Sequence, residues 1–116
     1  MTGTVRIAPV VALCVVLASP AEARDLTDAE KIMIADAVRE TKQAPLSARY
    51  EWPPLAREYQ DKYCAWIDPG TGRVPFQALL VWHEGQLAFP IIVVMGGREA
   101  SAKAVASMCK QMGAPL

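Results

Sequence analysis

An apolar segment near the N-terminus limits which part of this chain can fold into a domain. Arg6 precedes the almost uninterrupted apolar run 7–18, and residues 21–23 have the small-x-small pattern that signal peptidase cleaves after. The run is about a dozen residues long, whereas a membrane-spanning helix needs roughly 20. We therefore predict a cleaved signal peptide at 1–23 and a single domain at 24–116 that works in the periplasm or outside the cell.

The charges of the chain are balanced and interspersed. It has 12 basic and 12 acidic side chains, which gives a net charge of +0. A protein that holds phosphate backbones needs a clustered excess of Lys and Arg, so we expect no nucleic acid partner. No later segment is long and apolar enough to cross a bilayer, so we also expect no membrane span after signal cleavage.

Two cysteines, Cys64 and Cys109, lie beyond the predicted signal peptide. Disulfides persist in exported proteins, and a small domain gains from one because its core is limited. Reactive thiol pairs usually have C-x-x-C spacing, whereas these two cysteines lie far apart in the sequence. We therefore predict a structural disulfide between them.

The pattern of apolar residues predicts a helix at each end of the domain, with strands between them. Thr27 and Glu30 form a capping box, and apolar residues then recur at spacings of three and four until Pro45 ends the helix. A glycine pair precedes the second helix, at 99–112. Strands are predicted at 62–68, 74–83 and 87–95, with a further short strand at 49–52.

The predicted fold class is α+β. We expect a small two-layer sandwich of order α-β-β-β-α, in which an antiparallel sheet carries both terminal helices on one face and one disulfide joins sheet and helix. Cys109 shares a helix face with Val105 and should look toward the strand that carries Cys64. The β-branched run 91–94 favours a strand buried on both sides, although the same run could serve an interface between copies.

Three segments of the chain resemble a group of small exported bacterial proteins of unknown function. They are Lys42-Gln43-Ala44-Pro45-Leu46-Ser47-Ala48-Arg49-Tyr50 after a helix, Tyr63-Cys64-Ala65-Trp66-Ile67, and Gly72-Arg73-Val74-Pro75-Phe76. They are similar to that group's Lys-x-x-Pro-x-Ser-Ala turn, Tyr-Cys strand and Pro-Phe strand. The resemblance implies an envelope protein and carries no catalytic residue with it.

His83 is the only histidine, so no histidine-based metal site is expected, and two distant cysteines do not form a zinc site alone. We predict no metal and no cofactor. An alternative function is a small secreted hydrolase that uses His83 with a nearby carboxylate, Glu84 or Asp68. An ordinary strand-end histidine is the favoured interpretation, because no nucleophile motif accompanies it.

Gly96, Gly97 and Arg98 form a candidate anion site. A glycine pair between a strand and a helix start can leave N–H groups free to hold an anion, and the arginine would add charge. However, Glu99 already lies in the first helical turn, and the lysine of a phosphate loop is missing. A structural turn is the favoured interpretation.

A group of aromatic residues around Pro53-Pro54 offers a candidate binding surface for a partner protein or a cell-wall glycan. Its members are Tyr50, Trp52, Tyr59, Tyr63 and Trp66. The competing interpretation places these rings in the core, because aromatic side chains dominate burial in a small domain. The sequence favours an exported, non-catalytic envelope protein that binds a partner of unknown identity or acts as an accessory module.

Overall fold

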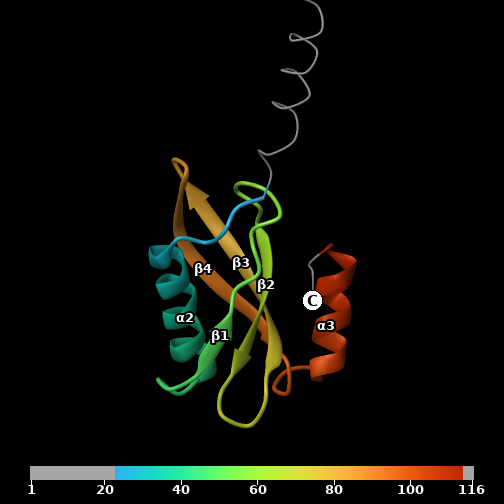
Figure 1. Ribbon diagram of the computed structural model, residues 1–116. Coiled ribbons are helices and arrows are strands. Elements are labelled where there is room, and N and C mark those ends of the chain that lie inside the picture. The colour runs from blue at the N-terminus through green and yellow to red at the C-terminus, as the bar shows by residue number, and fades with distance from the viewer. Residues whose placement is uncertain (1–22, 114–116) are drawn as a thin grey trace, which may run out of the picture.

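The computed structural model describes residues 23–113 and shows an antiparallel sheet with a helix on either side (Figure 1). The strands follow one another in the order β1-β2-β3-β4, each antiparallel to the next. The elements are α2 (Asp28–Lys42), β1 (Arg49–Glu51), β2 (Lys62–Asp68), β3 (Val74–His83), β4 (Gln86–Met95) and α3 (Ala102–Gln111). The α+β fold and the three-strand meander are confirmed, and β1 adds a fourth strand at one edge. The predicted signal peptide, apart from Ala23, lies outside the described residues.

Helix α2 begins at the predicted capping box. The Thr27 hydroxyl accepts a hydrogen bond from the Glu30 N–H at 3.1 Å, and the Glu30 carboxylate accepts one from the Thr27 N–H at 2.9 Å. These two bonds satisfy donors that a helix start otherwise leaves unpaired. On the sheet side of α2, Ile34 and Val38 are fully buried. The helix is therefore fixed both at its first turn and along one face.

Neighbouring residues of β2 pack against different helices. Tyr63 and Ala65 belong to the main core, which also contains Ile34 of α2. Cys64, which lies between them in the sequence, packs instead with Val105 and Cys109 of α3. Because successive side chains of a strand point to opposite faces of the sheet, α2 and α3 must cover opposite faces.

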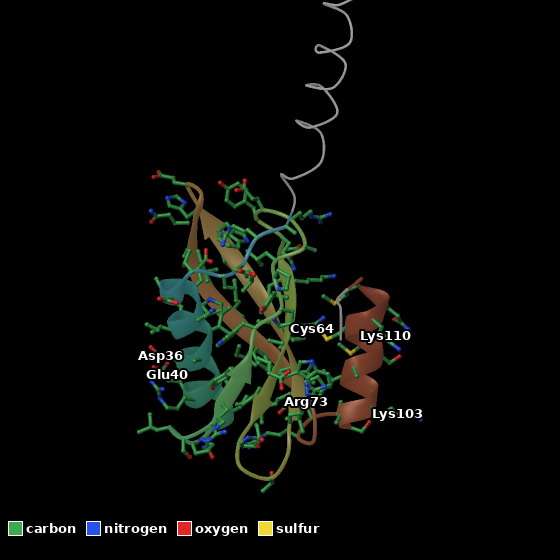
Figure 2. The ribbon with its side chains drawn as sticks, in the orientation of Figure 1. Asp36, Glu40, Cys64, Arg73, Lys103 and Lys110 are labelled. Atoms are coloured by element: carbon green, nitrogen blue, oxygen red, sulfur yellow. A yellow bond between two sulfur atoms is a disulfide. The ribbon has the colours of Figure 1, made fainter. Side chains whose placement is uncertain are left out.

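The prediction of a two-layer sandwich with both helices on one face is therefore corrected to three layers. Figure 2 shows this arrangement, with Asp36 and Glu40 on α2 at one side of the sheet and Lys103 and Lys110 on α3 at the other. The physical reason is that both faces of the sheet carry buried apolar side chains, with Tyr63 and Phe76 on one face and Cys64 and Val94 on the other. Helix α2 covers the face with the larger apolar cluster, and α3 covers the face that carries Cys64.

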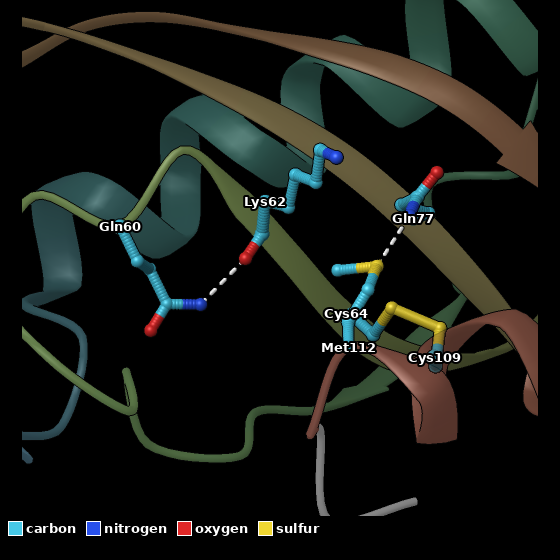
Figure 3. Close-up of a disulfide and its surroundings, with 6 residues drawn as sticks. All are labelled: Gln60, Lys62, Cys64, Gln77, Cys109 and Met112. Carbon is cyan, nitrogen blue, oxygen red and sulfur yellow. Dashed lines mark hydrogen bonds between the residues drawn. A yellow bond between two sulfur atoms is a disulfide. The ribbon is translucent and has the colours of Figure 1, made fainter.

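Helix α3 is held by few contacts besides the disulfide. Only Val105 and Cys109 are buried along it, and the predicted bond between Cys64 and Cys109 is present with a Cα–Cα distance of 6.0 Å. The Gln77 side-chain amide also donates to the sulfur of Met112, just after the helix (Figure 3). The disulfide thus joins α3 covalently to β2, whereas α2 is held by the packing of Ile34 and Val38 without a covalent bond.

An ion pair fixes the start of the described chain to α2. The Arg24 guanidinium donates to both carboxylate oxygens of Glu30, at 2.8 and 2.9 Å. The Arg24 backbone also pairs with that of Leu55, through bonds of 3.2 and 2.7 Å. The hydrogen bonds from Arg24 hold the pKa of Glu30 below its ordinary value of 4.5, against the effect of burial. The charged form of Glu30 is the one that the fold stabilises.

We expect Glu30→Gln to lower the free energy of unfolding at pH 7 by about 2 kcal/mol, the usual size for hydrogen bonds to a charged group. Since the pKa of Glu30 is lower in the folded than in the unfolded state, the unfolded chain binds more protons between the two values, and stability falls as pH drops through that window. The parent should thus lose stability below about pH 4.5, and Glu30→Gln should lose less.

Urea unfolding between about pH 3 and pH 7 measures both effects, because the free energy of unfolding extrapolates linearly from denaturant. Glu40→Gln, on the exposed side of the same helix, is the matched control and should behave like the parent. A Glu30→Gln variant with the parent's loss of stability in acid would contradict this account of the ion pair.

Candidate functional site

The aromatic residues predicted to form one binding surface are divided among several places. Tyr63 is buried in the main core, where its hydroxyl donates to the Pro53 carbonyl at 2.6 Å. The prediction that Tyr63 belongs to a binding surface is therefore wrong, because the alternation of side chains along β2 places it on the face that α2 covers. Tyr50 and Trp52 stack with their ring centroids 5.0 Å apart and pack, partly buried, against the same core.

The other two rings lie elsewhere. Trp66 is on the face that carries α3, where the Arg73 guanidinium lies 4.1 Å from its ring centroid and is paired with Glu51 at 2.6 Å. A groove of about 310 Å³ beside it is lined by Arg49, Tyr50, Glu51, Trp66 and Asp68. Tyr59 is exposed and packs edge-on against Trp82, with the centroids 5.5 Å apart. The structure does not bring the five rings together.

The N–H groups of the candidate anion site are used within the turn. Gly96 donates to the Pro75 carbonyl at 2.8 Å, Gly97 to that of Ala100 at 2.7 Å, and Arg98 to that of Met95 at 3.2 Å. A β-carbon at Gly96 would lie 2.8 Å from the backbone of α3, so this glycine permits a close approach between strand and helix. These three donors are not free, and the contacts fit the structural turn that the sequence favoured over an anion site.

A carboxylate also lies at this turn. Glu99 accepts a hydrogen bond from the Met95 N–H at 3.1 Å and pairs with Lys42 of α2 at 3.0 Å. The hydrogen bond from Lys42 lowers the pKa of Glu99, so the group stays negative at neutral pH. A negative charge at this turn opposes the binding of an anion.

His83 and its candidate carboxylates are not gathered in a sheltered site. The side chains of His83 and Glu84 are 76 % and 84 % exposed at the tip of the β3–β4 hairpin, with 3.4 Å between Nε2 and Oε1. Asp68 caps the turn at the other end of β3, where it accepts from Gly70 and Gly72. Ten residues of β3 separate these two ends, a span of roughly 30 Å. Within residues 23–113, no three His, Cys, Asp or Glu side chains lie close enough together to hold a metal ion.

The largest exposed apolar side chains of the sheet lie instead on β4, which was predicted to be buried on both sides. Phe89, Ile91 and Val93 are 51 %, 46 % and 49 % exposed. In the register of the sheet, Phe89 pairs with Val81 and Ile91 with Leu79. The expectation of burial on both faces is therefore wrong for these positions.

These paired residues lie on the face that α3 covers only in part. Gln77 contacts Met112 at the end of α3. Leu79 and Val81 lie two and four residues further along β3, so their side chains point to the same face of the sheet as Gln77. In Figure 1 the hairpin of β3 and β4 extends past the end of α3. We call the four apolar residues beyond the helix, Leu79, Val81, Phe89 and Ile91, the open face.

Polar residues border the open face on the side of β2. Lys62 pairs with Leu79 in the register, and the Gln60 side chain donates to the Lys62 carbonyl at 2.6 Å (Figure 3). A hollow of about 440 Å³ here is lined by Ala56, Arg57, Gln60, Asp61, Lys62 and Met112. An apolar centre with a polar border is the usual anatomy of a protein interface.

Sequence analysis favoured burial of this strand and left an interface at 91–94 as the alternative, because every residue from Leu87 to Met95 is uncharged and apolar. Such a run gives no alternation that would show which face is covered. The lack of charge was the only available signal, and it fits a buried strand equally well.

Comparison with known proteins found no matching family, no matching curated protein and no matching solved structure. The resemblance to small exported bacterial proteins therefore stays a prediction. Between residues 23 and 113, no helix has the length and apolar character needed to cross a membrane.

Proposed function

We propose that this chain is an exported, non-catalytic protein-binding module of the cell envelope and that the open face is its binding surface. The observation that carries the proposal is the exposure of Phe89 and Ile91, at 51 % and 46 %, beside each other on a sheet. A small domain gains from covering such side chains, since burying apolar surface contributes about 25 cal/mol per Å². Contiguous exposed apolar residues with a polar border typically mark interaction sites.

The chemistry of the open face favours a protein over a glycan. Sugars are usually held by aromatic rings together with side chains that hydrogen-bond to hydroxyl groups. The open face has one aromatic ring, Phe89, and its other members, Leu79, Val81 and Ile91, have no side-chain donor or acceptor. An apolar side chain of a partner protein would fit this surface best.

Export is supported by the N-terminal pattern and by the buried disulfide. Cys64 and Cys109 are both buried, and disulfides of this structural kind persist mainly in oxidising compartments. The full chain, expressed in a bacterial host with a C-terminal tag, should be recovered from the periplasm with the mass of a protein that begins at Arg24. Recovery of the uncleaved chain from the cytoplasm would contradict this part of the proposal.

Capture from envelope extract tests the binding function. The tagged parent is compared with Phe89→Glu, which puts a charge in the middle of the open face, and with Leu46→Glu, which changes an 83 % exposed residue in a turn elsewhere. We expect a partner that the parent and Leu46→Glu retain and that Phe89→Glu loses. A partner that all three proteins retain equally would show that the open face is not the binding surface.

A further inference from the structure

The open face has no charge that would prevent it from meeting a copy of itself. Strand β4, Gln86–Met95, contains no charged residue, and Leu79 and Val81 beside it are also apolar. In a two-fold contact each residue near the axis meets its own counterpart, so a charge there would face a like charge. An uncharged centre is what such a contact requires.

The free edge of β4 is poorly suited to pairing with another strand. The Leu80 N–H donates toward β2, to the Asp61 carbonyl at 2.7 Å, so its partner Pro90 has its nitrogen on the free edge. Proline has no N–H to offer there. The register shifts at Ala88 and Val93 interrupt the edge further. A second chain would therefore contact the face of the sheet instead of its edge.

The size of the open face indicates a weak contact. It spans three residues on each of two strands, or roughly 10 Å by 10 Å. A stable interface takes about 800 Å² from each partner, so the polar border must contribute as well. That border carries both signs in adjacent positions, Asp61 and Lys62, which allows Lys62 of one copy to lie near Asp61 of the other.

We infer that the partner of the open face is a second copy of this chain, bound face to face about a two-fold axis with a dissociation constant in the micromolar range. This inference rests on the proposed function, because it assumes that the open face binds protein. The two-fold axis passes near Phe89 and Ile91. Each copy covers the apolar residues that α3 leaves exposed on the other.

Sedimentation equilibrium of the mature protein from about 1 to 300 μM tests the dimer. The mean mass of the parent should rise with concentration from that of one chain toward that of two. Phe89→Glu should weaken the association at least tenfold, since the charge would be desolvated opposite a like charge. Ile91→Lys, which introduces the opposite sign, should do the same, and Leu46→Glu should match the parent.

A parent that stays monomeric throughout this range would overturn the dimer, as would association that continues beyond two chains or that neither open-face variant weakens. Both variants change exposed residues, and coincident thermal unfolding curves would show that they fold like the parent. A monomeric parent that still captures a different partner through Phe89 would overturn the dimer and leave the proposed function standing. A dimer that captures nothing from the extract would support the dimer and count against a separate partner.

Discussion

Replacing Cys64 and Cys109 together by alanine is expected to lower the free energy of unfolding by about 4 kcal/mol, the loop-closure entropy of a cross-link over this separation. The two cysteines lie 45 positions apart. The effect should be concentrated in α3, because Val105 is the only other residue that this helix buries. We expect α3 to detach from the sheet while α2 and the main core remain folded.

Denaturant unfolding gives the overall loss, and amide hydrogen exchange separates the two helices. The α3 amides should exchange almost as fast as in an unfolded chain, whereas those of α2 should keep their protection. Ser107→Ala, which changes an exposed position of α3, is the control and should retain protection in both helices. Full protection of α3 without the disulfide would show that packing alone holds the helix.

Phe76→Ala should cost about 4 kcal/mol of unfolding free energy, whereas Phe89→Ala should cost less than about 1 kcal/mol. The chemical change is the same in both variants. Phe76 is fully buried in the main core and packs edge-on against Tyr50, with the ring centroids 6.3 Å apart, whereas Phe89 lies on the open face. The difference between the two losses of unfolding free energy therefore reports how much more deeply Phe76 is buried than Phe89.

Chemical denaturation of the two variants beside the parent checks this prediction. The comparison should be made at about 0.1 μM protein, below the micromolar dissociation constant inferred for the open face, so that self-association contributes little. Similar losses for the two variants would mean that Phe89 is covered in the monomer, which would remove the basis for the open face.

Much of the fold could be predicted from the sequence because its signals are local. The capping box at Thr27 and Glu30 depends on residues three positions apart. The cysteine pair is not local, but Cys64 and Cys109 are the only two cysteines beyond the predicted signal peptide, so only one pairing had to be considered. The side of the sheet that each helix covers depends on distant packing. The alternation of Tyr63 and Cys64 already placed them on opposite faces, yet α3 with its Cys109 was expected on the same side as α2.

The candidate sites were less predictable for the same reason. Whether the N–H groups of Gly96 and Gly97 are free depends on carbonyls of Pro75 and Ala100, and the first of these lies on another strand. Whether Phe89 is covered depends on where α3 ends. A single sequence shows which residues are suited to a site, and the tertiary structure decides which of them solvent and partners can reach.

The open face can be tested most directly by fluorine NMR, because the chain has two phenylalanines and they lie in opposite environments. Protein labelled with 4-fluorophenylalanine should give one resonance from Phe76 and one from Phe89, assigned with Phe89→Leu. As protein concentration rises from about 1 to 300 μM, we predict that the Phe89 resonance shifts while that of Phe76 stays in place. A Phe89 resonance that does not move, or an equal shift of both, would contradict self-association through the open face.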